Sequence, residues 1–146
     1  MDIKVKYFNQ LTNDELYDLL QLRSEVFVVE QQCIYQDIDG KDPKGLHVLG
    51  YINKQLVAYT RSFRPGDYFD EAAIGRVVVK ESERKFKLGY KIMEATIEAI
   101  QSHFNCTRIQ LSAQTYLIDF YQNQGFTILG EEYLEDGIPH ILMIKT

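Results

Sequence analysis

The stretch VVVKESERKFKLGYKIMEATIEAI (Val77–Ile100) decides the fold, because it joins a strand to a long helix through a basic turn. The three Val residues at its start favour a strand buried on both faces. From Lys87 to Phe104, apolar residues recur at helical spacing. The cationic side chains near the turn are Lys80, Arg84, Lys85, Lys87 and Lys91. Such a helix start favours an anionic ligand, although a solvated surface turn has the same composition.

The segments on either side of this stretch predict a mixed β-sheet with helices on its faces. Residues 2–7 alternate between apolar and polar, which indicates a strand, and a capping box of Thr12 and Glu15 predicts the start of a helix. The pattern then predicts a hairpin over residues 46–63, strands over 72–79 and 108–113, a helix over 115–124 and two strands around Asp136-Gly137. Strand, long helix and strand in the middle imply a parallel crossover.

The first helix and the loop after it carry unusual charge. Arg23 falls on the apolar stripe of the helix, so it must extend its head toward solvent or pair with a carboxylate. Residues 31–45 are rich in acids and turn formers, which predicts a structured loop.

The composition predicts one globular domain over residues 1–146, with a formal net charge of -5 and 45% hydrophobic residues. No segment approaches the roughly 18 apolar residues of a membrane span, and the N-terminus lacks the layout of a signal peptide. We therefore expect a cytoplasmic protein. Cys33 and Cys106 are too few to staple the fold and suit a reducing compartment. The acidic balance disfavours general nucleic-acid binding.

Several common catalytic and ligand-binding motifs are absent. The chain has neither a phosphate-binding P-loop nor a dinucleotide fingerprint. The stretch DIDGKD (Asp37–Asp42) lacks the ligand order and the terminal Glu of a calcium loop. His47, His103 and His140 lack the paired spacing of a zinc site, so we expect no bound metal.

The basic turn belongs to a pattern that resembles a known family. The stretches RVVVKESERKFKLGYKIM (Arg76–Met93) and DFYQNQGF (Asp119–Phe126) are similar to the cofactor half of the GNAT N-acetyltransferase superfamily. The stretches that resemble its ElaA-like subgroup are LLQLRSEVFVVEQQCIYQDIDGKD (Leu19–Asp42), IGRVVV (Ile74–Val79) and EDGIPHILM (Glu135–Met143). The resemblance spans nearly the whole chain. It implies an α/β fold in which a mixed sheet of six to seven strands is flanked by about four helices.

The resemblance also implies a site for acetyl-CoA. The residues that the family pattern places around the coenzyme A pyrophosphate are Arg84, Lys85, Phe86, Lys87, Leu88, Gly89 and Tyr90. The free N–H groups of a helix start and the small Gly89 agree with this role. Lys87 departs from the pattern, because it stands where the family usually has its first Gly.

Two further segments match cofactor contacts of the family. Val77, Val78 and Val79 match the strand whose backbone pairs with the pantetheine arm, while their side chains also suit a sheet core. Gln114 stands where the family often has an Asn that contacts the cofactor.

The resemblance implies a catalytic acid, and the chemistry requires a base. Tyr121 matches the family's Tyr beside the cofactor sulfur, where a phenol protonates the departing thiolate. Its alternative role is packing beside Phe120. Acyl transfer needs a free amine, so a base must take a proton from the ammonium form. We rank His140 first for this task, although a strand His is commonly structural.

Candidates for the acceptor side are weaker. Asp37, Asp39 and Asp42 lie in one loop and would attract a cationic amine, although a solvated surface loop has the same composition. Glu30, at the end of the first helix, and His47, on the hairpin, are further candidates.

These features predict an enzyme that transfers an acetyl group from acetyl-CoA to a primary amine by direct attack in a ternary complex. The acceptor is a small molecule or a peptide, and the chain is a monomer or a homodimer. A covalent route through Cys106 is a lesser variant. The alternative function is a non-catalytic module of the same fold that binds or senses acyl-CoA or a partner protein.

Overall fold

The computed structural model describes residues 1–146, and its strands form one mixed sheet. The strands are β1 (Asp2–Tyr7), β2 (Leu46–Ile52), β3 (Gln55–Phe63), β4 (Ala72–Val79), β5 (Ile109–Gln114), β6 (Thr127–Ile128), β7 (Tyr133–Glu135) and β8 (Ile138–Lys145). Their order across the sheet is β1-β2-β3-β4-β5-β8-β6, and β7 also pairs with β8. Every pairing is antiparallel except that of β4 with β5, which confirms the predicted parallel crossover.

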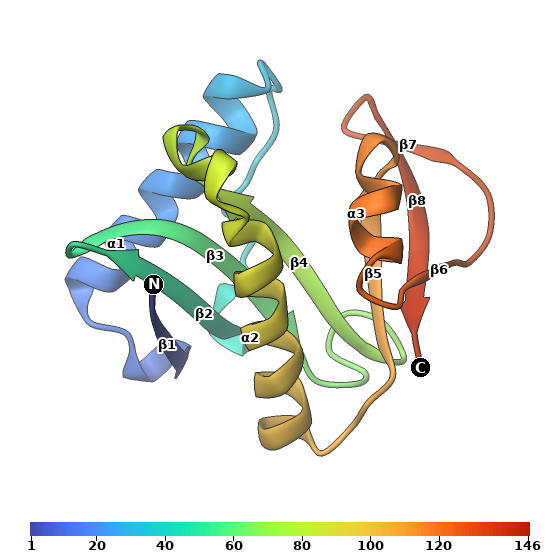
Figure 1. Ribbon diagram of the computed structural model, residues 1–146, viewed down its shortest axis with the longest axis horizontal. Helices are drawn as coiled ribbons and strands as arrows, with labels where there is room; N and C mark the ends of the chain where they lie inside the picture. Colours follow the sequence, from blue (N-terminus) through green and yellow to red (C-terminus); the bar gives the residue numbers. More distant parts are fainter.

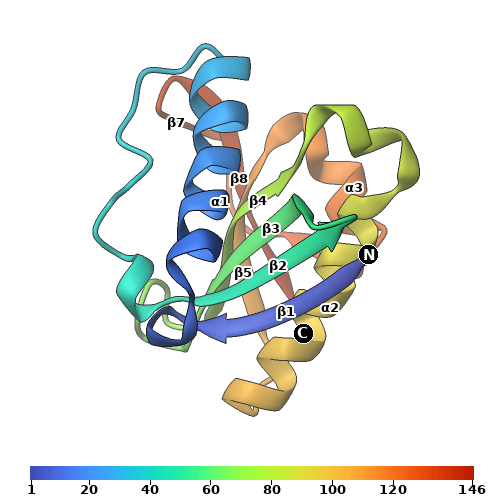
Figure 2. The same ribbon diagram turned by 90° about the vertical axis from the view of Figure 1, so that its left-hand side faces the viewer.

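Helices cover both faces of this sheet (Figure 2). One face carries α1 (Asn13–Arg23) and its π-helical continuation η2 (Ser24–Glu30), and the other carries α2 (Leu88–Phe104) and α3 (Ile118–Gln122). The short 3-10 turns are η1 (Phe8–Gln10), η3 (Asp42–Lys44), η4 (Glu81–Phe86) and η5 (Thr115–Leu117). The predicted α/β class is thereby confirmed. None of the helices is long and apolar enough to span a lipid bilayer.

The sheet has eight strands where six to seven were expected. The difference arises in residues 127–135, which form two short strands instead of one. Gly130, with a φ of 96°, lies between β6 and β7 and turns the chain there. As a result β6 pairs with one half of β8 and β7 with the other.

The first helix starts at the predicted capping box. Thr12 Oγ1 accepts from the N–H of Glu15 (3.1 Å), and the Glu15 carboxylate accepts from the N–H of Thr12 (2.9 Å). Lys4 and Lys6 of β1 donate to the same carboxylate at 3.2 and 2.7 Å. Burial raises the pKa of Glu15, but these hydrogen bonds outweigh burial and lower the pKa to about 2. An ionised Glu15 therefore fastens α1 to β1.

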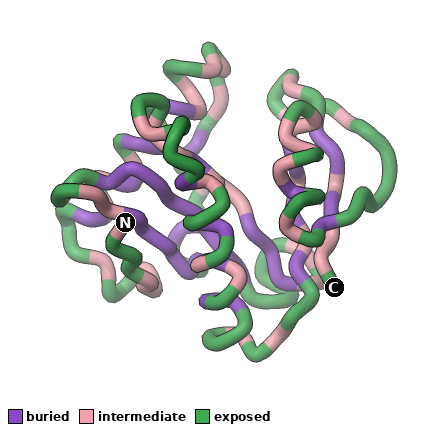
Figure 3. Tube along the Cα trace, in the orientation of Figure 1, coloured by how far each residue is buried: buried purple, intermediate pink, exposed green.

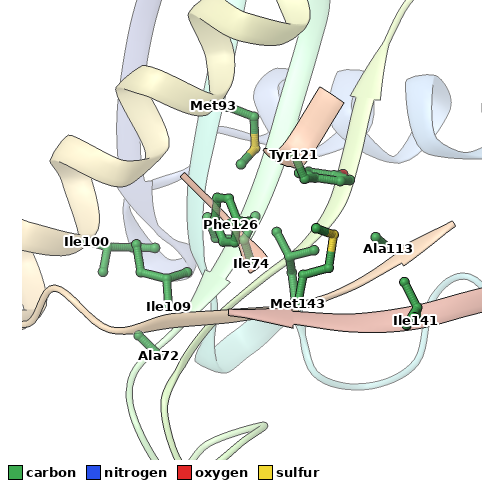
Figure 4. Packing of buried hydrophobic residues seen from close by; sticks show 11 residues of the cluster. Ala72, Ile74, Met93, Ile100, Ile109, Ala113, Tyr121, Phe126, Ile141 and Met143 are labelled. Carbon is green, nitrogen blue, oxygen red and sulfur yellow. The ribbon is translucent and has the colours of Figure 1, made fainter. Parts of the chain in front are cut away.

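The largest part of the core lies between the sheet and helices α2 and α3 (Figure 4). It comprises Ala72, Ile74, Met93, Ile100, Ile109, Leu111, Ala113, Tyr121, Phe126, Ile141 and Met143. A second cluster packs α1 against the other face, and buried residues are concentrated along β2, β3 and β4 (Figure 3). In Figure 4, Tyr121 lies on the side of Phe126 that faces Ala113 and Ile141, and Ile100 lies on the other side. This packing fixes α3 beside β5 and leaves Tyr121 at the edge of the core.

The parallel strands β4 and β5 pair only near their starts and then diverge (Figure 1). Residues 72–74 pair with 109–111, and no pairing follows. Arg76 has a left-handed backbone (φ 50°) at a bulge where the register between β3 and β4 shifts. Beyond it, Val78 and Val79 stay paired with β3 while residues 112–114 stay paired with β8. An opening therefore forms between the ends of the two strands.

Candidate active site

A cleft lies where β4 and β5 diverge. One wall comes from η2, the loop after it, β3 and β4, and the other from β5, β8 and the β7–β8 turn. Leu117 and Tyr121 reach it from the α2 and α3 side of the sheet. Of the 22 lining residues 13 are hydrophobic, so the few polar groups among them decide what the cleft can bind.

The edge of β4 at this cleft offers backbone groups that pair with no neighbouring strand. The N–H of Lys80 donates to Val57 O on β3 (2.7 Å). Because backbone groups point to alternate sides along a strand, those of Val77 and Val79 point away from β3, toward the opening. These are the groups that an extended ligand containing amides needs for pairing.

Lys87 has the left-handed backbone that Gly adopts readily. Its φ of 58° and ψ of 29° place it between η4 and α2 as the N-cap of α2. The N–H groups in the first turn of an α-helix have no intrahelical partner. At this helix end no side chain caps them either. Lys87 therefore departs from the family pattern in side chain but keeps the backbone conformation for which Gly is suited.

Gly89 is small for a reason that the sequence did not indicate. The expected reason was room for a phosphate. A Cβ at this position would lie 3.2 Å from both Cε1 and Cζ of Phe120 on α3. Phe120 also packs on Tyr90, with ring centroids 4.8 Å apart. The Phe120 ring thus occupies the space beside Gly89 and joins α3 to the start of α2.

Arg84 is the best-anchored cation of the basic turn. It donates two hydrogen bonds to the Glu30 carboxylate (2.6 and 2.8 Å), and its Nε donates to Val79 O (3.1 Å). The hydrogen-bonded Glu30 carboxylate raises the pKa of Arg84. Glu30 is therefore directed to the basic turn and does not line the cleft, where it was expected. The exposed cations here that make no ion pair are Lys85, Lys87 and Lys91.

Tyr121 is both a core residue and a wall of the cleft. Its ring packs edge-on against Phe120 and Phe126, at centroid distances of 5.0 and 6.0 Å. Burial raises the pKa of the phenol, so the group stays protonated near neutral pH. The two roles that the sequence left open, packing and proton donation, are compatible at this position.

His140 lies opposite Gln114 on the β5–β8 ladder and also lines the cleft. Its Nδ1 lies 2.7 Å from Ile138 O. Because a carbonyl oxygen only accepts, Nδ1 carries the proton and Nε2 of the neutral ring holds the lone pair. Nε2 lies 3.4 Å from the Glu135 carboxylate. This tautomer and position suit a base.

Two contacts cross the mouth of the cleft. Gln31 Nε2 donates to Gln114 Oε1 (3.2 Å), and both side chains line the cleft. Cys33 Sγ lies 3.5 Å from Asp136 O in the β7–β8 turn. The segment after η2 is thereby joined to the opposite wall.

The carboxylates of the acidic loop are paired with arginines. The pairs are Arg23 with Asp37 (2.9 Å) and Asp42 (2.7 Å), Arg61 with Asp39 and Asp42 (2.9 Å each), and Arg76 with Asp37 (2.7 Å) and Asp39 (3.4 Å). Of the two alternatives that the sequence left open for Arg23, the structure shows pairing with carboxylates. We call these six residues the Arg–Asp network.

Four of the six residues of the Arg–Asp network are buried, and the network is balanced in charge. Arg23 and Arg61 are 0% and 1% exposed. Burial raises the pKa of Asp39 and of Asp42, but the arginines outweigh burial and hold both pKa values below the usual range. The network therefore holds the acidic loop against the sheet, and its carboxylates are committed to arginine.

His47 is fully buried behind this network and does not line the cleft. Its Nε2 lies 3.0 Å from Asp42 O and so carries the proton, while Nδ1 accepts from the Tyr59 hydroxyl at 2.6 Å. Burial lowers the pKa of His47, which keeps the ring neutral. The structure thus places His47 in the support of the loop and away from the acceptor side.

The cleft also contains residues that the sequence did not single out, chiefly Gln31, Arg76, Ser112 and Glu135. Glu135 could have been found from the sequence, because a two-residue hairpin turn at Asp136-Gly137 brings it near His140. The left-handed backbone of Arg76 has no comparable signal, since nothing in its neighbours demands it.

The family profile of the acetyltransferase (GNAT) domain matches residues 9–146. This chain belongs to that family. Protein ElaA of Escherichia coli (strain K12) is 46% identical to it over 141 residues, which are 95% of this chain and 92% of ElaA. The chain is thus an ElaA-like GNAT protein, and membership of the family supports an acyl-CoA-dependent acyltransferase activity.

Solved structures agree with this assignment. The crystal structure of an acyl-CoA N-acyltransferase from Pseudomonas aeruginosa superposes with a TM-score of 0.94 at 42% identity and covers 100% of both chains. That of Escherichia coli ElaA gives 0.92 at 43% identity over 99% of each chain. An aminoglycoside 6'-N-acetyltransferase complexed with coenzyme A, 17% identical, shares the fold over 97% of this chain and 96% of its own, with a TM-score of 0.72.

Proposed function

We propose that this GNAT protein transfers an acetyl group from acetyl-CoA to a primary amine, by direct attack of the amine in a ternary complex. The observation that carries the proposal is the divergence of β4 from β5 beside an uncapped helix start, with Tyr121 in the wall between them.

The chain's own groups fit the donor. The backbone of Val77 and Val79 suits the amides of a pantetheine arm, and Gln114 can turn its amide to the same arm by releasing Gln31. The free N–H groups at Leu88, Gly89 and Tyr90 suit the pyrophosphate, with added positive charge from the lysines of the turn. No group of three or more His, Cys, Asp or Glu side chains is placed to hold a metal ion.

Tyr121 and His140 divide the proton transfers. Acetyl-CoA supplies a thioester whose carbonyl carbon the amine nitrogen attacks, so that a C–N bond forms and the C–S bond breaks. His140 Nε2 takes the proton that the ammonium form loses, directly or through water. Tyr121 donates its phenolic proton to the departing sulfur, and the second proton lost by the nitrogen restores the phenol. The products are an N-substituted acetamide and the coenzyme A thiol.

A direct route agrees better with the structure than one through Cys106. This thiol does not line the cleft, and burial raises its pKa, which disfavours the nucleophilic thiolate. Replacing Cys106 with Ser is therefore expected to leave turnover intact.

The test is release of free thiol from acetyl-CoA in the presence of primary amines. We expect turnover with at least one amine class. Tyr121→Phe is expected to lower kcat by about a hundredfold while the Kd for acetyl-CoA stays unchanged. If the protein binds acetyl-CoA but releases no thiol with any of the amines, it is instead a sensing module.

A further inference from the structure

Ser112 lies at the point where β4 and β5 separate. The last residue of β5 that pairs with β4 is Leu111, opposite Ile74, so Ser112 is the first residue of β5 beside the opening. Its side chain lines the cleft. In the proposed complex the pantetheine arm runs along this opening, from the start of α2 toward the closed end between the strands. Ser112 therefore lies where the acyl end of the donor arrives.

The Ser112 side chain faces the same side of the sheet as His140. Side chains alternate along a strand, and Leu111 belongs to the core that packs against α2 and α3. Ser112 and Gln114 consequently project from the opposite face, where His140 is the cross-strand partner of Gln114. The Ser112 hydroxyl and the proposed base thus face the thioester from one side, whereas Tyr121 reaches it from the α2 and α3 side.

Gly75 leaves open space across the cleft from Ser112. It is the first residue of β4 beyond the ladder, and it also lines the cleft. Because Ile74 belongs to the core, residue 75 faces the same side of the sheet as Ser112. A Cβ at Gly75 would meet no heavy atom within 4 Å. An attacking nitrogen therefore has room beside the Ser112 hydroxyl.

Tyr133 of β7 holds this hydroxyl in place. The hydroxyl groups of Ser112 and Tyr133 are hydrogen-bonded, and Tyr133 itself does not line the cleft. The Tyr133 ring also lies beside the imidazole of His140, its partner on the β7–β8 ladder, with centroids 6.2 Å apart and planes at 34°. One side chain therefore restrains two polar groups that face an incoming amine.

The hydrogen bond to Tyr133 leaves Ser112 able to accept another. A hydroxyl oxygen has two lone pairs and one proton. Whichever of the two oxygens donates in the bond, Ser112 Oγ retains at least one lone pair for a donor in the cleft. A free primary amine carries two N–H donors and one lone pair, so a hydrogen bond from one N–H to Ser112 restrains the direction of that lone pair. Such orientation of a nucleophile lowers the barrier to attack.

We propose that Ser112 is a further catalytic residue, which accepts a hydrogen bond from the attacking amine and directs its lone pair at the thioester carbon. Tyr133 is the positioning residue that fixes the Ser112 hydroxyl. No proton is transferred to Ser112, because His140 takes the proton of the ammonium form and Tyr121 protonates the sulfur. The inference rests on the proposed acetyl transfer and adds two residues to it.

The test is a double-mutant cycle with acetyl-CoA as donor and thiol release as the readout. The acceptor probes are ethylamine, putrescine and phenethylamine, and the one that the wild type acetylates fastest is used throughout. Ser112→Ala is expected to lower kcat about tenfold and to leave the Kd for acetyl-CoA unchanged. The factor should be the same at every pH at which the wild type is active, because the serine hydroxyl does not titrate there.

Tyr133→Phe keeps the ring beside His140 and removes the hydroxyl that holds Ser112. We expect it to lower kcat about threefold in the wild-type background and to have no further effect in the Ser112→Ala background. Gln110→Ala is the matched control, since Gln110 alternates with Leu111 on β5, as Ser112 does, but does not line the cleft. This control should keep the kcat of the wild type.

The outcomes separate this inference from the proposed function. Wild-type kcat in Ser112→Ala, a loss that varies with pH, or an equal effect of Tyr133→Phe in both backgrounds overturns the inference and leaves the proposed function standing. A wild type that releases no thiol with any amine overturns the proposed function, and the inference with it.

Discussion

The ring of Phe120 lies against the backbone of Gly89, so that a Cβ at residue 89 would meet two of its ring carbons at 3.2 Å. Gly89→Ala therefore forces this ring, or the start of α2, to move. In the wild-type background, we expect Gly89→Ala to lower the free energy of unfolding by about 1 kcal/mol more than it does in a Phe120→Ala background, where the ring is absent. We also expect Gly89→Ala to weaken acetyl-CoA binding in the wild-type background. Urea unfolding of the four variants measures this coupling. An equal effect in both backgrounds would show that the Phe120 ring does not restrict residue 89.

A second prediction concerns the left-handed backbone of Lys87. A non-Gly residue pays a steric penalty there, so Lys87→Gly is expected to raise the free energy of unfolding by about 0.5–1 kcal/mol. Lys87→Ala keeps the penalty and removes the charge, which makes it the matched control. If the lysine contributes through its charge, both variants bind acetyl-CoA more weakly. A Lys87→Gly variant with a lower free energy of unfolding than the wild type would contradict this prediction.

Much of this fold could be predicted from the sequence, because the signals are local. The capping box at Thr12 and the parallel crossover around α2 are confirmed. The sequence did not predict that residues 127–135 divide at Gly130 into β6 and β7. The short β6 forms because it pairs with β8, and its own residues carry no clear strand pattern.

The site was harder to predict, because its side chains are placed by long-range contacts. Charge alone suggested that Asp37, Asp39 and Asp42 face an acceptor, whereas the fold brings Arg61 and Arg76 to them from distant strands. The space beside Gly89 likewise depends on Phe120, which is remote in sequence and adjacent in structure.

The ion pair between Arg84 and Glu30 provides a third prediction. Arg84 also covers Val79 O, one of the backbone acceptors at the open edge of β4. Glu30→Gln weakens this anchor, so we expect tighter acetyl-CoA binding, by up to about fivefold, because Arg84 is released toward the pyrophosphate. Titration calorimetry measures the change. Weaker binding in the variant would mean that the pair shapes the site instead of competing with it.

The Arg–Asp network predicts how stability depends on pH. The pKa of Asp42 is held below its ordinary value of 3.8, so the stability that this carboxylate contributes is present above about pH 4 and is lost as the pH falls below it. Asp42→Asn leaves Arg23 and Arg61 with an uncompensated charge, which should lower the free energy of unfolding by about 3 kcal/mol at pH 7.

The deficit of Asp42→Asn should narrow in acid, because the wild type then loses the same contribution. Urea unfolding at pH 7 and pH 3 checks both statements. Asp67→Asn, at an exposed carboxylate without an ion pair, is the control and should match the wild type at both pH values. A deficit that stays constant between these pH values would contradict the assignment.

The proposed function requires that the opening between β4 and β5, together with the start of α2, binds acetyl-CoA. Titration calorimetry of the wild-type protein with acetyl-CoA tests it most directly, with Gly89→Ala as the variant that disturbs the helix start. We expect binding at one site with a Kd in the micromolar range, weakened in the variant by about fivefold or more. No binding by the folded wild-type protein at high micromolar acetyl-CoA would contradict it.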